Sequence, residues 1–173
     1  MALVTVIVGS ATDRPVVDPA LDIFRRFKVP YELKVASAHR DPKKVYEIVK
    51  AGEENGTRVF IAAAGMAAHL AGVVAANTVR PVIGLPVGSG PLKGQDSLLS
   101  TVMMPSGVPV ATVAIDGGKN AAWLALQILA LLPDGARIQK ELEEERDRAR
   151  ELLEEAEEQW LEDLENKNSI PKS

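Results

Sequence analysis

The chain repeats one pattern five times: a short apolar run, a turn rich in glycine or serine, and then a segment with helical periodicity. The five apolar runs, each predicted to be a strand, are residues 3–8, 31–36, 58–63, 81–87 and 108–115. Strands separated by helical crossovers pair in parallel, and the helices cover both faces of the sheet they form. The repeat therefore predicts an α/β fold built on one five-stranded parallel sheet.

The run at residues 59–64 is apolar without interruption, which is typical of a central strand covered by helices on both sides. Helices are predicted at about residues 15–28, with Thr12 or Asp13 as the cap, and at residues 42–55. Further helices are expected through Asn77, in a short segment that ends at Pro105, and at residues 121–132. This order predicts a doubly wound, flavodoxin-like sheet in a three-layer α/β/α arrangement.

Charge divides the chain into a globular part and a tail. Residues 1–139 carry 14 Lys and Arg against 11 Asp and Glu, whereas residues 140–167 carry 5 against 13. We expect a catalytic domain at residues 1–133, a charged C-terminal helix at 134–167 and a frayed tail at 168–173. The helix has a narrow apolar stripe, which fits either a solvated helix with i,i+4 ion pairs or a helix that lies on a neighbouring subunit. The segment 121–132 is apolar nearly all round, which favours a homo-oligomer because one domain would leave part of it uncovered.

Composition excludes several classes of protein. The chain has no cysteine, which excludes disulfides, thiolate catalysis and cysteine-based zinc sites. A mildly basic domain with an acidic tail argues against a nucleic-acid surface and fits a small anionic ligand. No apolar segment is long enough to span a bilayer, and residues 1–8 are better used as a strand than as a signal peptide. We therefore expect a cytoplasmic protein that binds neither membrane nor nucleic acid.

Small polar side chains gather where the predicted strands end. They are Ser10, Thr12, Asp13, Ser37, His39, Arg40, His69, Ser89 and Lys119. Ligands of open parallel sheets bind beyond the carboxyl ends of the strands, so these residues mark the expected site. The Gly9-Ser10 turn feeds a helix N-terminus, whose free N–H groups favour a phosphate. Ser37 and Arg40 add a hydroxyl and a guanidinium at a second strand end.

The chain has only two histidines, and both fall in strand-end loops. A single histidine is more often a satisfied structural group than a catalyst, but two at neighbouring strand ends favour proton transfer. We expect His69 to lie buried in a tight apolar turn. Two histidines without cysteine are too few for a dedicated zinc site, and the sequence contains neither a Walker motif nor Gly-x-Gly-x-x-Gly. The residues thus predict an enzyme without metal or cofactor that moves a proton on a phosphorylated small molecule.

Five segments resemble the N5-carboxyaminoimidazole ribonucleotide mutases of purine biosynthesis. They are Gly-Ser-Ala-Thr-Asp at residues 9–13, Ser-Ala-His-Arg at 37–40, Ala-Gly-Met-Ala-Ala-His-Leu-Ala-Gly at 64–72, Asp-Ser-Leu-Leu-Ser at 96–100 and Met-Pro-Ser-Gly-Val-Pro-Val-Ala-Thr at 104–112. The resemblance covers residues 3–132 in unbroken order. It implies a flavodoxin-like subunit in an octamer whose active sites are shared between subunits. It also implies a cofactor-free shift of a carboxylate from an exocyclic nitrogen to C4 of an imidazole ribonucleotide, with CO2 as a transient intermediate.

The resemblance assigns roles by position. His39 would be the general acid/base, with His69 as the second catalytic residue. The residues expected to hold the phosphate and ribose, and those expected to line the base and CO2 pocket, are Gly9, Ser10, Thr12, Asp13, Ser37, Arg40, Ala64, Gly65, Ala67, Ala68 and Leu70. The chain departs from the family pattern at Thr12, Met66, Ala71, Gly88 and Met103, where the family usually has Ser, Gly, Pro, Gln and Gln.

Two alternatives remain open at the sequence level. A sister class carboxylates aminoimidazole ribonucleotide directly with CO2, as a lyase, and lacks the Ala-Ala-His-Leu sequence that contains His69 here. A non-catalytic nucleotide-binding module would use the same strand-end turns without needing His39.

Overall fold

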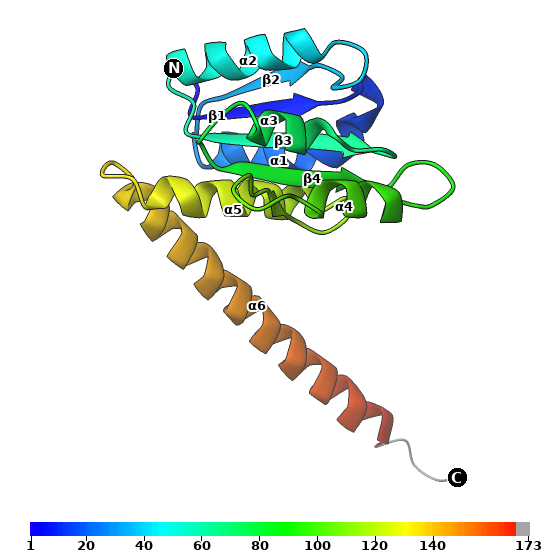
Figure 1. Cartoon of the computed structure of the whole chain (residues 1–173). Helices are drawn as coiled ribbons and strands as arrows, with labels where there is room; N and C mark the ends of the chain where they lie inside the picture. The colour runs from blue at the N-terminus through cyan, green and yellow to red at the C-terminus, as the bar shows by residue number, and fades with distance from the viewer. Residues whose placement is uncertain (169–173) are drawn as a thin grey trace.

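The computed structural model describes residues 1–168 of the chain, and the side chains of residues 1–165 (Figure 1). The strands are β1 (Val4–Val8), β2 (Tyr31–Val35), β3 (Val59–Gly65), β4 (Val82–Val87) and β5 (Ala111–Thr112). The helices are α1 (Arg14–Arg26), α2 (Pro42–Glu54), α3 (Leu70–Ala75), α4 (Gln95–Val102), α5 (Gly118–Ala130) and α6 (Ala136–Asn168). A single 3-10 turn, Ala11–Asp13, precedes α1. No helix in this described part is long and apolar enough to cross a membrane.

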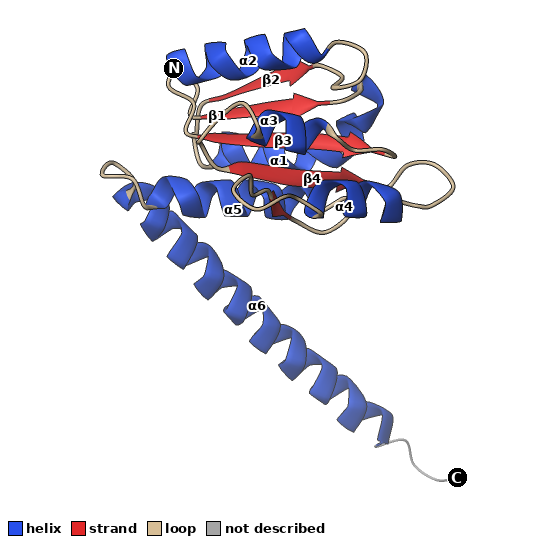
Figure 2. Ribbon diagram, viewed as in Figure 1, coloured by secondary structure: helices blue, strands red, loops and turns tan. Residues whose placement is uncertain are grey.

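The five strands form one sheet in the order β2-β1-β3-β4-β5, and every pair is parallel (Figure 2). The predicted doubly wound, flavodoxin-like sheet is therefore confirmed. Val8, the last residue of β1, pairs with Val35 of β2 and with Ala63 of β3. The carboxyl ends of these strands thus lie side by side, and the loops that follow them meet.

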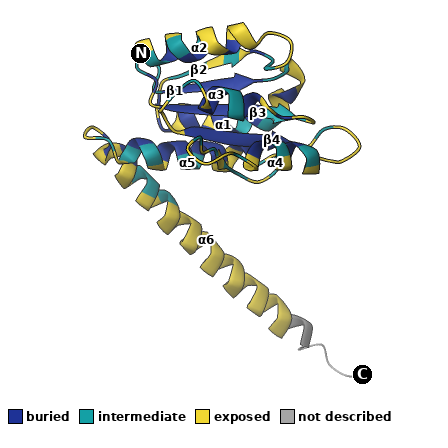
Figure 3. Cartoon of the chain, in the orientation of Figure 1, coloured by how far each residue is buried: buried dark blue, intermediate teal, exposed yellow. Residues whose placement is uncertain are grey.

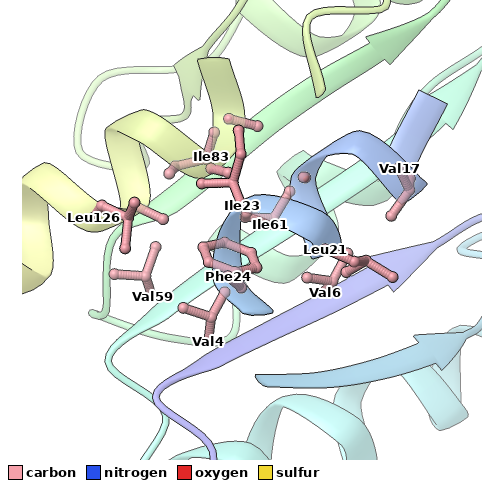
Figure 4. Close-up of a cluster of buried hydrophobic side chains, with 14 of the residues drawn as sticks. Val4, Val6, Val17, Leu21, Ile23, Phe24, Val59, Ile61, Ile83 and Leu126 are labelled. Carbon is pink, nitrogen blue, oxygen red and sulfur yellow. The ribbon is translucent and has the colours of Figure 1, made fainter. Parts of the chain in front are cut away.

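The sheet packs helices on both faces, as expected for three layers. On one face α1 and α5 cover β1, β3 and β4, and Phe24 of α1 is completely buried among Val4, Ile61 and their neighbours (Figure 4). On the other face Val45 of α2 and Val74 of α3 pack on the opposite side chains of the same strands. Because β1, β3 and β4 are covered on both sides, they need apolar residues at successive positions rather than in alternation.

The predicted fifth strand at residues 108–115 is wrong in extent, since only Ala111 and Thr112 pair with β4. Pro109 has no N–H to donate to a ladder, and the N–H of Val108 donates instead to the Pro105 carbonyl in a turn. The remaining predicted strands and helices are present, with ends that differ by a few residues. For example, α1 ends before Lys28 because that residue takes a positive φ of 50°.

The start of α6 packs against the domain, and the rest extends away from it (Figure 3). Ile138 is buried in the core beside α5, and Leu142 packs on its edge. Arg137 donates to the Phe27 carbonyl at 3.0 Å, and Arg26 pairs with Glu145 at 3.0 Å. The apolar surface of α5 is therefore largely covered by α1, the sheet and α6 of the same chain. The argument from the sequence that the second face of α5 requires another subunit is thus wrong. Of the segment predicted to be frayed, Asn168 ends α6 and the remainder lies outside the described residues.

Candidate active site

A cavity of about 480 Å³ opens at the carboxyl ends of β1, β2, β3 and β4. Its lining residues are Gly9, Ser10, Thr12, Asp13, Ser37, Ala38, His39, Arg40, Ala64, Gly65, Met66, Ala67, His69, Leu70 and Ser89. The fold thus brings together all the predicted site residues except Ala68 and Lys119. Lys119 lies in the first turn of α5 and does not line this cavity. Ala68 is only 2 % exposed and does not reach the cavity wall.

The turn after β1 is held by a reciprocal capping arrangement. The Ser10 backbone N–H donates to Asp13 Oδ2 at 3.2 Å, and Ser10 Oγ accepts from the Thr12 backbone N–H at 3.3 Å. The Thr12 hydroxyl also donates to Ser10 Oγ, at 2.8 Å. Ser10 therefore caps the 3-10 turn, and Asp13 occupies the N-cap position of α1, as predicted, although its side chain makes no capping hydrogen bond to that helix. These contacts fix a turn with hydroxyls at the cavity wall, next to the N-terminus of α1.

Asp13 is a buried carboxylate in this turn, with 7 % of its surface exposed. Burial raises the pKa of Asp13 above its usual value, and the hydrogen bonds from Ser10 and Thr12 only partly oppose that rise. The folded protein consequently holds the Asp13 proton more tightly than the unfolded chain does. By linkage, its contribution to stability is present at low pH and is lost as the pH rises through the folded pKa.

We therefore expect the Asp13→Asn variant to unfold at a higher temperature than the natural protein at neutral pH. The amide carries no charge to desolvate, and its oxygen can still accept from Ser10 N–H. Thermal unfolding followed at several values between about pH 4 and pH 8 checks this, since the two curves should converge toward acid. Asp18→Asn removes a partly exposed carboxylate from α1, the helix that follows this turn, and serves as control. A variant less stable than the natural protein at neutral pH would contradict the argument.

The turn after β2 reaches across to the turn after β1. Ser37 Oγ accepts from the Arg40 backbone N–H at 3.3 Å, and the Arg40 guanidinium donates to the Gly9 carbonyl at 3.4 Å. This contact places a cation beside the Ser10 turn although Arg40 and Gly9 are 31 positions apart in the chain. Two strand-end turns therefore combine hydroxyls, a helix N-terminus and a guanidinium at one wall, which is suited to a phosphate.

The end of β3 lies so close to the loop after β4 that no side chain would fit at Gly65. A Cβ at this position would lie 2.1 Å from Ser89 Oγ, in the loop after β4. Ala67 and Ala68 follow, with short contacts between Ala68 N–H and the Met66 carbonyl and between His69 N–H and the Ala67 carbonyl, both at 2.8 Å. The small residues allow the loops after β3 and β4 to meet at the cavity.

The two histidines face one another across the cavity wall. His39 Nε2 lies 2.6 Å from His69 Nδ1, and the rings meet edge to face with centroids 4.8 Å apart. Both side chains are exposed, so the expectation that His69 is buried in an apolar turn is wrong. At this distance one nitrogen donates and the other accepts, so the pair shares one proton. Each ring has a second nitrogen outside this contact, an arrangement that is chemically able to pass a proton between two further partners.

Two residues of the cavity wall, Ala38 and Met66, were not predicted as site residues, whereas Ser89 was. Ala38 lies within the Ser-Ala-His-Arg segment, and Met66 is one of the departures from the family pattern. The sequence signal for Ser89 was its place in a Gly-Ser-Gly turn directly after β4. In residues 1–165, no group of three or more His, Asp or Glu side chains is arranged to hold a metal ion.

Comparison with known proteins gives one consistent result. The family model described as AIR carboxylase matches residues 3–151. The N5-carboxyaminoimidazole ribonucleotide mutase of Pyrococcus horikoshii is 57% identical over 129 residues, which cover 75% of this chain and 73% of that protein. The mutase of Thermotoga maritima is 50% identical over 157 residues, covering 90% and 91%, and that of Bacillus subtilis is 46% identical over 161 residues, covering 92% and 98%.

The fold is shared with a solved structure. The crystal structure of PurE from Treponema denticola superposes with a TM-score of 0.80 at 26% sequence identity. The superposition covers 91% of this chain and 98% of that one.

Proposed function

Since the chain belongs to the AIR carboxylase family, we propose that it is an N5-carboxyaminoimidazole ribonucleotide mutase of purine biosynthesis. Such an isomerase converts N5-carboxyaminoimidazole ribonucleotide into 4-carboxyaminoimidazole ribonucleotide. The observation that carries the proposal is the pair of imidazoles, His39 and His69, in contact at 2.6 Å in the cavity at the strand ends. A binding module would need the hydroxyls and the guanidinium of this cavity but not a proton relay.

The substrate's 5-phosphate binds at the wall formed by Ser10, Ser37 and Arg40. Support comes from the position of the Arg40 guanidinium against the Gly9 carbonyl and from the hydroxyls around it. Asp13 lies behind this wall and faces the ribose, whose hydroxyls can donate to its second carboxylate oxygen. The aminoimidazole ring then extends toward the turn of small residues after β3.

The reaction needs one proton delivered and one removed. As the carbamate C–N bond breaks, its electron pair passes to the exocyclic nitrogen, which takes up a proton, and CO2 is released. C4 of the ring then attacks the carbon of CO2, and loss of the C4 proton restores aromaticity. The protons balance, so one group that donates and then accepts suffices. His39 performs this role, with His69 as the second member of the relay.

The test of this function is conversion of N5-carboxyaminoimidazole ribonucleotide by the purified protein without added bicarbonate. A mutase forms the 4-carboxy product at a rate that bicarbonate does not change. The direct carboxylase, a lyase on the same scaffold, would instead require aminoimidazole ribonucleotide and form product in proportion to bicarbonate. Ligand binding without product from either substrate would favour a non-catalytic nucleotide-binding module.

The chain is also expected to form a homo-oligomer, with the family's octamer as the proposed assembly. Support comes from apolar side chains that nothing in the described chain covers. On α6 these include Leu153 and Trp160, which are 71% and 65% exposed. On α4 they include Leu99, and Met103 follows the helix. Apolar faces of this extent on a long helix and on a helix beside the site fit contacts between copies.

Two truncations separate the two halves of α6. Removal of residues 146–173 should leave the fold intact, because Ile138, Leu142 and the Arg26–Glu145 pair remain. It should shift light scattering toward a smaller assembly, since the exposed apolar stripe is lost. Removal of residues 136–173 should in addition cost at least about 2 kcal/mol of unfolding free energy, because it uncovers α5 and deletes the buried Ile138. A full-length protein that is monomeric at micromolar concentration would contradict the oligomer.

A further inference from the structure

Met66 has an unusual backbone conformation for its residue type. Its φ is 53°, in the left-handed region that side chains disfavour, and it is the first residue after β3. The side chain is 58% exposed although it is large and apolar, and it lines the cavity. Glycine would occupy this position without strain. A strained residue at the wall of an active-site cavity points to a function for its side chain.

The Met66 side chain lies where the loops after β3 and β4 meet. A Cβ built on Gly90 would stand 3.5 Å from Met66 Cγ and 3.8 Å from its sulfur. One residue earlier in each loop the approach is closer, since a Cβ built on Gly65 would lie 2.1 Å from Ser89 Oγ. Met66 therefore lies where the two loops approach each other at the wall of the cavity.

We infer that Met66 retains CO2 in the site between its release and its attachment to C4, an inference that rests on the proposed mutase function. CO2 is small and has no net charge, so the hydroxyls and the guanidinium that anchor the phosphate give little hold on it. A close apolar wall slows its escape by restricting the space through which it can leave. Among the cavity-lining residues of the described chain, Met66 is the only long apolar side chain in the turn between β3 and α3, and it lies beside the position of Gly90 in the loop after β4.

The retained molecule is the carboxylate carbon of the substrate. Breaking the C–N bond leaves CO2 and the free amine, with the electron pair on nitrogen. The new C–C bond uses the same CO2 only if the molecule has not left. When it escapes, a CO2 from solution can take its place, and the product then contains solvent carbon. Exchange of the carboxylate carbon with solvent thus measures retention directly, independently of the rate.

The experiment follows turnover of N5-carboxyaminoimidazole ribonucleotide in isotope-labelled bicarbonate with carbonic anhydrase, and mass spectrometry gives the labelled fraction of product. We expect little label with the natural protein, and about a tenfold larger labelled fraction with Met66→Ala and Met66→Gly, as for loss of a hydrophobic contact. Met66→Leu should restore low incorporation. Val79→Ala, at an exposed position before β4, is the control for loss of an apolar side chain elsewhere.

The labelled fraction and the formation of product distinguish a wrong role for Met66 from a wrong proposed function. Equal labelled fractions in all variants that form product would overturn the role of Met66 and leave the mutase intact. No product from any of them, including the natural protein, would overturn the proposed function itself. Thermal unfolding adds a check on the strain: Met66→Gly should unfold at a higher temperature than Met66→Ala, because only glycine relieves the positive φ. The reverse order would remove the strain from which the inference begins.

Discussion

The His39→Asn variant is expected to lose turnover by a factor of about 10²–10⁴, the usual contribution of a general acid/base. Asparagine keeps a hydrogen-bonding side chain of similar reach but cannot carry a proton between the exocyclic nitrogen and C4. Nucleotide affinity should change little, because the phosphate wall of Ser10, Ser37 and Arg40 is untouched. Steady-state kinetics with N5-carboxyaminoimidazole ribonucleotide, together with calorimetric binding of aminoimidazole ribonucleotide, measure the two quantities separately.

His69→Asn is the matched variant, since His69 is the other ring of the 2.6 Å pair. Its loss removes the partner of His39 but leaves an imidazole at the end of the β2 turn. We expect a smaller fall in turnover, with release of free aminoimidazole ribonucleotide from an incomplete reaction. If His39→Asn kept near-native turnover while His69→Asn lost it, the roles of the two residues would have to be exchanged.

The Arg40→Ala variant is expected to bind the nucleotide about 10- to 150-fold more weakly, a loss of roughly 1.5–3 kcal/mol for a hydrogen bond to a charged group. The guanidinium stands against the Gly9 carbonyl, at the wall where the phosphate is proposed to bind. Its removal leaves the phosphate with neutral donors only. Calorimetric titration with aminoimidazole ribonucleotide gives the dissociation constant.

Arg58→Ala provides the matched control for the loss of one positive charge. Arg58 immediately precedes β3, at the amino end of the strand and thus at the opposite edge of the sheet from the cavity. Arg40→Lys should give an intermediate affinity, because an ammonium keeps the charge but not the planar pair of donors. Unchanged affinity in Arg40→Ala would remove Arg40 from the phosphate site.

Much of the fold follows from the order of apolar runs along the chain. The run before Gly65 is apolar at successive positions, and only a strand covered on both faces can bury such a run. Once the strands are parallel, their carboxyl ends share one edge, so the turns that contain Ser10, Arg40 and His69 must come together. That is why the composition of the candidate site could be predicted from the sequence, although Ala68 and Lys119 were also assigned to it and do not line the cavity.

Tertiary packing, by contrast, decided the distances between the side chains of the site and which helix surfaces are covered by other elements. Periodicity cannot give the 2.6 Å contact of His39 with His69, since it depends on how two loops thirty residues apart are oriented by β2 and β3. Nor does it show that α6 of the same chain covers α5, because an apolar helix surface is compatible with any apolar neighbour. The positive φ of Met66 and the burial of Asp13 are also visible only in the tertiary structure. The sequence by itself determined which groups meet at the strand ends. The tertiary structure decided how far apart these groups lie, how exposed they are and which partners they contact. These properties depend on residues that are distant in the chain.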